Sequence, residues 1–186
     1  PDPLRYFLSA AMPETSDSDF SWHEFVRRNN DELVATYGNL VHRVLTIVHR
    51  NFEGHVPPFT EDRSETLVHQ QLRTQAETAL VNVGESIGKC HFREALGHAM
   101  GLAAEVNRYL DRRAPWKQVR EDLDAAARTM YTSLYALSAL SVMLYPFLPF
   151  SSQKLHELLG RSGSISDLGW NLVTPITGTP IPKPEA

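Results

Sequence analysis

Apolar side chains recur every three or four positions over most of the chain, which is the spacing of one face of an α-helix. The pattern predicts helices at 21–52, 64–88, 92–111, 120–145 and 151–160, preceded by a shorter one at 4–11. No run of alternating apolar and polar residues is long enough to build a sheet. The sequence therefore predicts an all-α antiparallel helix bundle of about five helices.

The predicted helix at 21–52 contains a start signal and a possible break. Ser21 is followed three residues later by Glu24, a capping box that predicts a helix start. The apolar pattern then continues to about residue 52, and Asn29-Asn30-Asp31 is predicted as a break within it.

Individual residues near the starts of three helices also have predicted positions. The apolar stripe of the helix 64–88 begins with Leu67 and that of the helix 120–145 with Leu123, so both are predicted to lie in the core. Ser151 and Ser152 are predicted to cap the last helix.

The chain changes character after residue 160. Glycine and proline become frequent and leave no room for a long regular element. We predict a helical domain at 1–160 and an irregular tail at 161–186, with a short strand near 170–173. The tail is expected to pack on the bundle or on a further domain, since the chain starts without a methionine inside a helix and reads as part of a longer protein.

Composition narrows the possible functions. A single cysteine, Cys90, excludes an internal disulfide framework and a multi-cysteine zinc site, and fits cytoplasmic surroundings. We interpret Cys90 as buried rather than as a nucleophile paired with His91. His42 and His49 stand two helical turns apart and are interpreted as surface residues, so no metal is predicted. No apolar run is long enough to cross a membrane.

Charge alone does not decide whether the partner is a nucleic acid. The formal net charge of −4 argues against one, because phosphate binding is mostly electrostatic. Arginine and lysine nevertheless gather between 108 and 120, so a local basic face is compatible with the sequence.

Two local patterns could bind an unpaired base. Asn39 and Arg43 are four residues apart and project from one face of a helix, where an amide and a guanidinium can read a base edge and hold a phosphate. Trp116 follows Pro115 at the junction of two helices and could stack on a base. Spacing alone favours the structural interpretations, a solvated polar face at Asn39 and Arg43 and a tryptophan folded back to close the bundle end.

Taken together, these patterns resemble the methionyl-tRNA synthetases. The matching segments are 4–8, 19–20, 30–43, 107–109 and 114–116, in that order and at similar spacing, and the segment 178–185 is similar to the end of that family. The resemblance covers most of the chain from Leu4 to about Phe150.

The resemblance implies a bundle that follows a catalytic domain in the same polypeptide and grips the anticodon loop of tRNA(Met). Asn39 and Arg43 fall where the family places base-contacting side chains, and Trp116 falls where it places a tryptophan that stacks on the anticodon. His42, Arg112, Arg113 and Lys117 are expected as supporting RNA contacts. Many relatives carry an asparagine where this chain has Ala35, so individual hydrogen bonds to the bases are expected to differ.

The family's two ATP-handling signatures are absent from this sequence. The resemblance therefore implies that the full-length ligase uses ATP and magnesium, and that this chain alone binds no cofactor and charges no tRNA. Alternatives are the corresponding domain of a class I synthetase for cysteine, valine, isoleucine or leucine, or a helical protein-interaction module with Trp116 as a hot spot. A third is a domain that binds RNA only together with its catalytic half.

Overall fold

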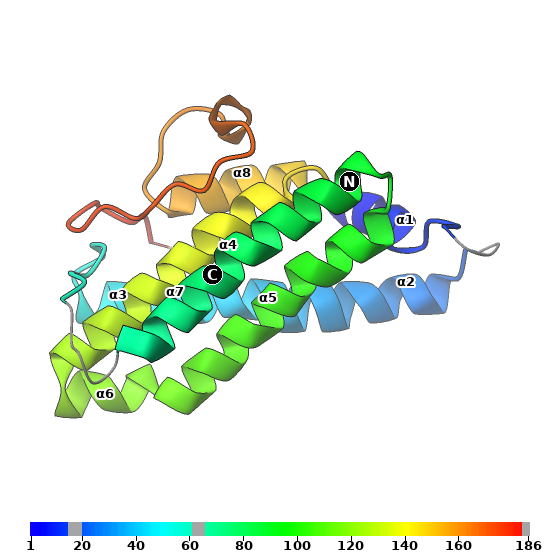
Figure 1. The fold of residues 1–186 in the computed structure, drawn as a ribbon. Helices are drawn as coiled ribbons and strands as arrows, with labels where there is room; N and C mark the ends of the chain where they lie inside the picture. The colour runs from blue at the N-terminus through cyan, green and yellow to red at the C-terminus, as the bar shows by residue number, and fades with distance from the viewer. Residues whose placement is uncertain (15–19, 61–65, 184–186) are drawn as a thin grey trace.

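The computed structural model describes residues 1–14, 20–60 and 66–183, and in them the regular elements are helices (Figure 1). The α-helices are α1 (Asp2–Ala10), α2 (Trp22–Arg28), α3 (Asn39–Asn51), α4 (Thr66–Gly88), α5 (Phe92–Arg113), α6 (Pro115–Glu121), α7 (Leu123–Leu144) and α8 (Pro149–Leu158). A π-helical segment, η1 (Asn29–Gly38), joins α2 to α3, and a 3₁₀ turn, η2 (Ile165–Leu168), follows α8. The expected all-α fold is confirmed.

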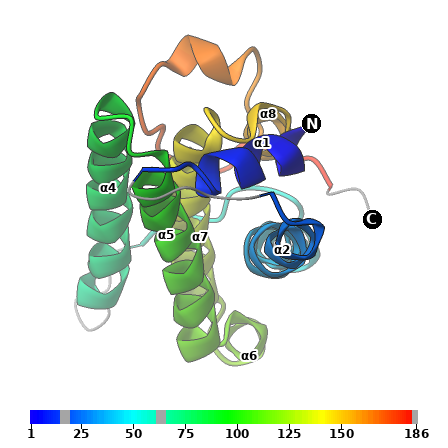
Figure 2. The same ribbon diagram turned by 90° about the vertical axis from the view of Figure 1, so that its right-hand side faces the viewer.

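Helix α7 forms the centre of the bundle. All its side chains from Ala125 to Leu144 are buried, as expected for a helix that is covered on every side. Helices α4 and α5 pack against it and against each other, and the α2–α3 helix lies on the side of α5 and α7 away from α4, below α1 and α8 (Figures 1 and 2). This arrangement brings α3, α5 and α6 together at one end of the molecule.

The predicted break at Asn29-Asn30-Asp31 is wrong, because α2, η1 and α3 form one uninterrupted helix from Trp22 to Asn51. The backbone hydrogen bonding changes from α to π at Asn29, and the Thr36 hydroxyl donates to the carbonyl of Asp31, five residues earlier, at 2.7 Å. Ion pairs cross the predicted break: Arg27 with Asp31 at 3.6 Å and Arg28 with Glu32 at 3.5 Å. Such pairs favour continuation of a helix.

The predicted cap at Ser21 is confirmed, since its hydroxyl accepts from the Glu24 amide at 3.4 Å. The caps predicted at Ser151 and Ser152 are wrong, because α8 begins two residues earlier at Pro149. The amide and the hydroxyl of Ser151 instead donate to Asp2 Oδ2, each at 2.7 Å. A carboxylate from α1 thus satisfies the first turn of α8.

Two predicted core leucines are exposed, Leu67 in the first turn of α4 and Leu123 at the start of α7. The exposure of Leu123 follows from a helix boundary that the apolar pattern does not show. Residues 115–121 form a separate helix, and the extended backbone at Asp122 precedes α7. The side chain of Asp122 accepts from the Ala125 amide at 2.9 Å, so this aspartate caps the central helix.

Replacing Asp122 with alanine is expected to lower the free energy of unfolding by about 1 kcal/mol, since an orphan amide of α7 loses its partner. Urea denaturation followed by circular dichroism measures the change. Asp124→Ala is the matched control, because Asp124 lies in the same first turn without being the cap. Equal losses for the two variants would show that the helix dipole, and not the cap, is responsible.

The strand predicted near 170–173 is wrong. Those residues are irregular, and the indole N–H of Trp170 donates to the carbonyl of Leu80 in α4 at 3.1 Å. The tail pairs instead with the loop after α3, through an isolated bridge between His55 and Pro180 and a hydrogen bond from the Ile181 amide to the Gly54 carbonyl at 2.7 Å. The described tail therefore lies on the bundle, whereas the domain boundary at residue 160 stays a prediction.

Candidate nucleic-acid interface

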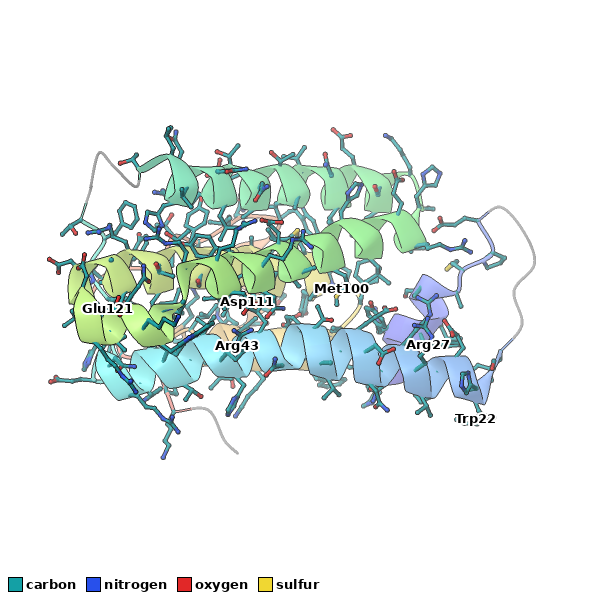
Figure 3. All side chains as sticks on the ribbon, turned by 90° about the horizontal axis from the view of Figure 1, so that it is seen from below. Trp22, Arg27, Arg43, Met100, Asp111 and Glu121 are labelled. Carbon is teal, nitrogen blue, oxygen red and sulfur yellow. The ribbon has the colours of Figure 1, made fainter. Side chains whose placement is uncertain are left out.

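Arg43 joins α3 to α5 at the end of the bundle where α6 also lies (Figure 3). Its Nη2 lies 2.8 Å from Asp111 Oδ1, and its Nη1 donates to Asn107 Oδ1 at 3.3 Å. Its side chain is 27% exposed, so the guanidinium is both fixed and reachable from solvent.

Asn107 sets the orientation of this arginine. Its side-chain amide donates to the carbonyls of Thr36 at 3.1 Å and Ala103 at 3.2 Å. With its nitrogen engaged in this way, its oxygen faces Arg43. The sequence contained Asn107 within a matching segment, but no spacing rule could assign it this role, because the Thr36 carbonyl becomes its partner only in the folded chain.

Trp116 is held at the junction of α5 and α6. Ala114 has a left-handed backbone (φ 47°, ψ 59°) that turns the chain, and buried Pro115 occupies the first position of α6. Trp116 is 41% exposed, and Arg43 Cζ lies 5.4 Å from the centroid of its ring. Trp116 is therefore not folded back into the bundle, and the structure brings it together with Arg43.

The remaining residues predicted on α3 are both exposed but lie on different stripes of the helix. Asn39 is one turn before Arg43 and shares its face. His42 instead lines a groove of about 680 Å³ between η1, α3 and α8, away from Trp116. The structure thus groups Asn39 with Arg43 and leaves His42 at the margin.

The predicted basic residues lie near the end of α5 and the start of α6. Arg112 Nη2 lies 2.7 Å from Glu105 Oε1, and Arg113 is half-buried while Lys117 is exposed. Burial of Glu105 favours its neutral form, but hydrogen bonds and positive charge from Arg112 and Arg108 outweigh burial and lower the pKa of its carboxyl. Glu105 is therefore ionised at neutral pH.

The interpretation of Cys90 as a buried residue is wrong. It occupies the turn between α4 and α5 with a left-handed backbone (φ 60°), and its side chain is exposed. Within 1–14, 20–60 and 66–183 no group of three or more His, Cys, Asp and Glu side chains is placed to hold a metal ion. In the same residues no helix combines the length and apolar character needed to span a bilayer.

An exposed tryptophan beside a fixed arginine, on an all-helical scaffold, is an arrangement suited to unpaired RNA, and comparison with known proteins specifies the class. Residues 1–45 match the family model described as "tRNA synthetases class I (M)". Residues 60–173 match the model described as "Anticodon binding domain of methionyl tRNA ligase". The chain belongs to this methionyl-tRNA ligase anticodon-binding domain family, which agrees with the resemblance of its sequence and favours methionine over the other class I synthetases.

Individual relatives agree with this assignment. The chain is 52% identical over 184 residues to the methionine–tRNA ligase of Dehalococcoides mccartyi, covering 99% of this chain and 33% of that protein. It is 49% identical over 165 residues to that of Chloroflexus aurantiacus, covering 89% and 27%. The crystal structure of Mycobacterium tuberculosis methionyl-tRNA synthetase bound by methionyl-adenylate superposes with a TM-score of 0.89 at 26% identity, covering 99% of this chain and 37% of that one. The chain thus spans about a third of the length of these relatives.

Proposed function

We propose that this chain recognises the anticodon loop of tRNA(Met) as part of a methionine–tRNA ligase. The observation that carries the proposal is the contact between Arg43 and the ring of Trp116, a residue that is 41% exposed. A tryptophan that served only to close the bundle end is on average largely buried, although rarely completely. Trp116 lies beside the Arg43 guanidinium and still presents much of its surface to solvent.

Each side chain has a chemical role in this proposal. Trp116 stacks on an unstacked anticodon base, and the left-handed turn at Ala114 limits the entropy lost when it does. Arg43 and Asn39 offer donors and an acceptor to the edges of the bases. Arg112, Arg113 and Lys117 contact the RNA backbone, with His42 as a supporting contact at the margin.

The remainder of the ligase reaction belongs to the longer protein. A catalytic domain in the same polypeptide would activate methionine with ATP and magnesium and transfer it to tRNA in the cytoplasm. This chain supplies tRNA selection, binds no cofactor and is inactive in aminoacylation by itself.

Two RNA hairpins test the proposal. One carries the methionine anticodon loop, and the other has the same stem with the three anticodon bases changed. The chain is titrated with each at one fixed salt concentration. We expect tighter binding of the first hairpin, because interactions with base edges depend on base identity whereas phosphate contacts do not.

Equal affinity for both hairpins would leave only electrostatic attachment and contradict anticodon recognition. Preference for a hairpin with the cysteine, valine, isoleucine or leucine anticodon would assign the chain to another class I synthetase. A protein-interaction module would bind neither hairpin, and its affinity for its protein partner would depend little on salt.

A further inference from the structure

Glu105 holds two arginines on the outer surface of α5. Arg108 donates to its Oε2 from Nε at 2.9 Å and from Nη2 at 2.6 Å, and Arg112 donates to its Oε1 from Nη2 at 2.7 Å. The Glu105 side chain is 19% exposed, whereas those of Arg108 and Arg112 are 61% and 62% exposed. One ionised carboxylate thus fixes two guanidinium groups that remain open to solvent.

This cluster lies beside the Arg43 site. Asn107 and Asp111, which bond Arg43, immediately precede Arg108 and Arg112 in sequence. Arg108 and Arg112 therefore project about 100° around the axis of α5 from Asn107 and Asp111, at nearly the same positions along it. Figure 3 places Arg43 and Asp111 at the contact between α3 and α5, so a strand of RNA over that contact would run past the exposed arginines.

The charges of the cluster favour an anion. Arg43 and Asp111 form a pair of opposite charge, while Glu105 faces two arginines, which leaves the cluster with a positive charge. Glu105 uses only some of the N–H donors of the two guanidinium groups, and those that remain match the oxygens of a phosphodiester. Exposed ion pairs of this kind add little to folding stability.

We propose that Arg108 and Arg112, positioned by Glu105, bind a backbone phosphate of the RNA loop whose bases contact Trp116 and Arg43. This inference rests on the proposed anticodon recognition. Glu105 orders both long side chains before RNA arrives, which reduces the entropy that they lose on binding. The two arginines contribute affinity for any loop sequence, and the discrimination between loops remains with Trp116, Asn39 and Arg43.

A second glutamate that holds two arginines provides a control, and its arginines also face Asp31 at 3.6 Å and Glu32 at 3.5 Å. Glu24 in α2 accepts from Arg27 at 2.6 Å and from Arg28 at 2.9 Å, three and four residues later. Figure 3 shows Arg27 beside Trp22, at the end of the molecule away from Arg43. General attraction between arginines and RNA would act at both clusters, whereas a phosphate site would act only at Glu105.

The experiment measures binding of both hairpins over a series of salt concentrations, with the parent chain, the double variant Arg108→Gln/Arg112→Gln and the double variant Arg27→Gln/Arg28→Gln. For the first variant we expect affinity to fall about tenfold for both hairpins alike, and the slope of log K against log[salt] to flatten by about 0.7 to 1. The preference for the methionine anticodon should be unchanged. The second variant should retain the parent's slope. Circular dichroism checks that each substituted chain keeps its fold, which matters most for Arg28, whose side chain is only 27% exposed.

An unchanged slope for Arg108→Gln/Arg112→Gln, or equal flattening in both variants, would overturn the phosphate site. Loss of the preference between hairpins in that variant would also overturn it, since the arginines would then be acting on the bases. If the parent shows no preference but the first variant alone flattens the slope, anticodon recognition fails and the phosphate contact stands. Absence of binding by the parent contradicts both proposals for this chain and favours a domain that binds RNA only together with its catalytic half.

Discussion

Replacing Trp116 with alanine is expected to weaken binding of the methionine-anticodon hairpin by about 1 to 3 kcal/mol, the usual loss when a base-stacking aromatic is removed. This corresponds to roughly a 5- to 150-fold higher Kd. The substitution also removes the ring that lies 5.4 Å from the Arg43 guanidinium. We therefore expect the preference between hairpins to shrink together with the affinity. Fluorescence anisotropy with labelled hairpins measures both quantities.

Trp22→Ala is the control for this substitution. Trp22 is 73% exposed, more than Trp116, and packs edge-on against Phe20 and Phe25 near the far end of the long helix. Its removal should leave the affinity for both hairpins unchanged. A similar loss in the two variants would mean that neither tryptophan marks the RNA site.

Replacing Gly160 with alanine is expected to destabilise the fold by about 2 to 4 kcal/mol. Gly160 has a left-handed backbone (φ 76°), which costs energy for any residue with a Cβ. A Cβ at this position would also lie 2.3 Å from the carbonyl oxygen of Pro180 and 2.9 Å from Thr179 Cγ2. The tail would have to move off the end of α8, and chemical denaturation measures the cost.

Gly163→Ala separates the two contributions. Gly163 is also left-handed (φ 83°), but the nearest atom to an added Cβ is Asp167 Oδ2 at 4.0 Å. Only the cost of the left-handed backbone should remain, about 1 to 2 kcal/mol. If Gly160→Ala costs no more than Gly163→Ala, the contact with the tail contributes nothing to stability.

Local patterns were sufficient to predict most of the helices. The spacing of apolar residues identified α4 and α5 closely, and the serine cap located the start of α2. These features depend on neighbours in sequence, and periodicity records them directly. The grouping of Asn39 with Arg43 followed for the same reason, since four residues place two side chains on one helical face.

Features that depend on distant residues were not predictable in this way. Asp2 satisfies the start of α8 across a separation of 149 residues, and serines close to that start were mistaken for its caps. Asn107 became important only because α5 packs beside the Thr36 carbonyl. The meeting of Arg43 with Trp116 likewise required the resemblance to a known family, because the two residues lie on separate helices.

The π-helical segment between Asn29 and Gly38 also determines the phase of the helix that carries Arg43. Each π hydrogen bond spans one residue more than an α bond, so α2 and α3 are offset around their common axis relative to a helix without the segment. The π-helical segment can absorb the deletion of one residue by returning to α-helical hydrogen bonding, but Trp22–Asn51 is continuous, so deletion of one residue between Gly38 and Arg43 would turn Arg43 by about 100° relative to the Trp22 end. Arg43 would then point away from Asp111, Asn107 and Trp116 together. In this part of the chain a change of length is therefore far more damaging than a change of side chain.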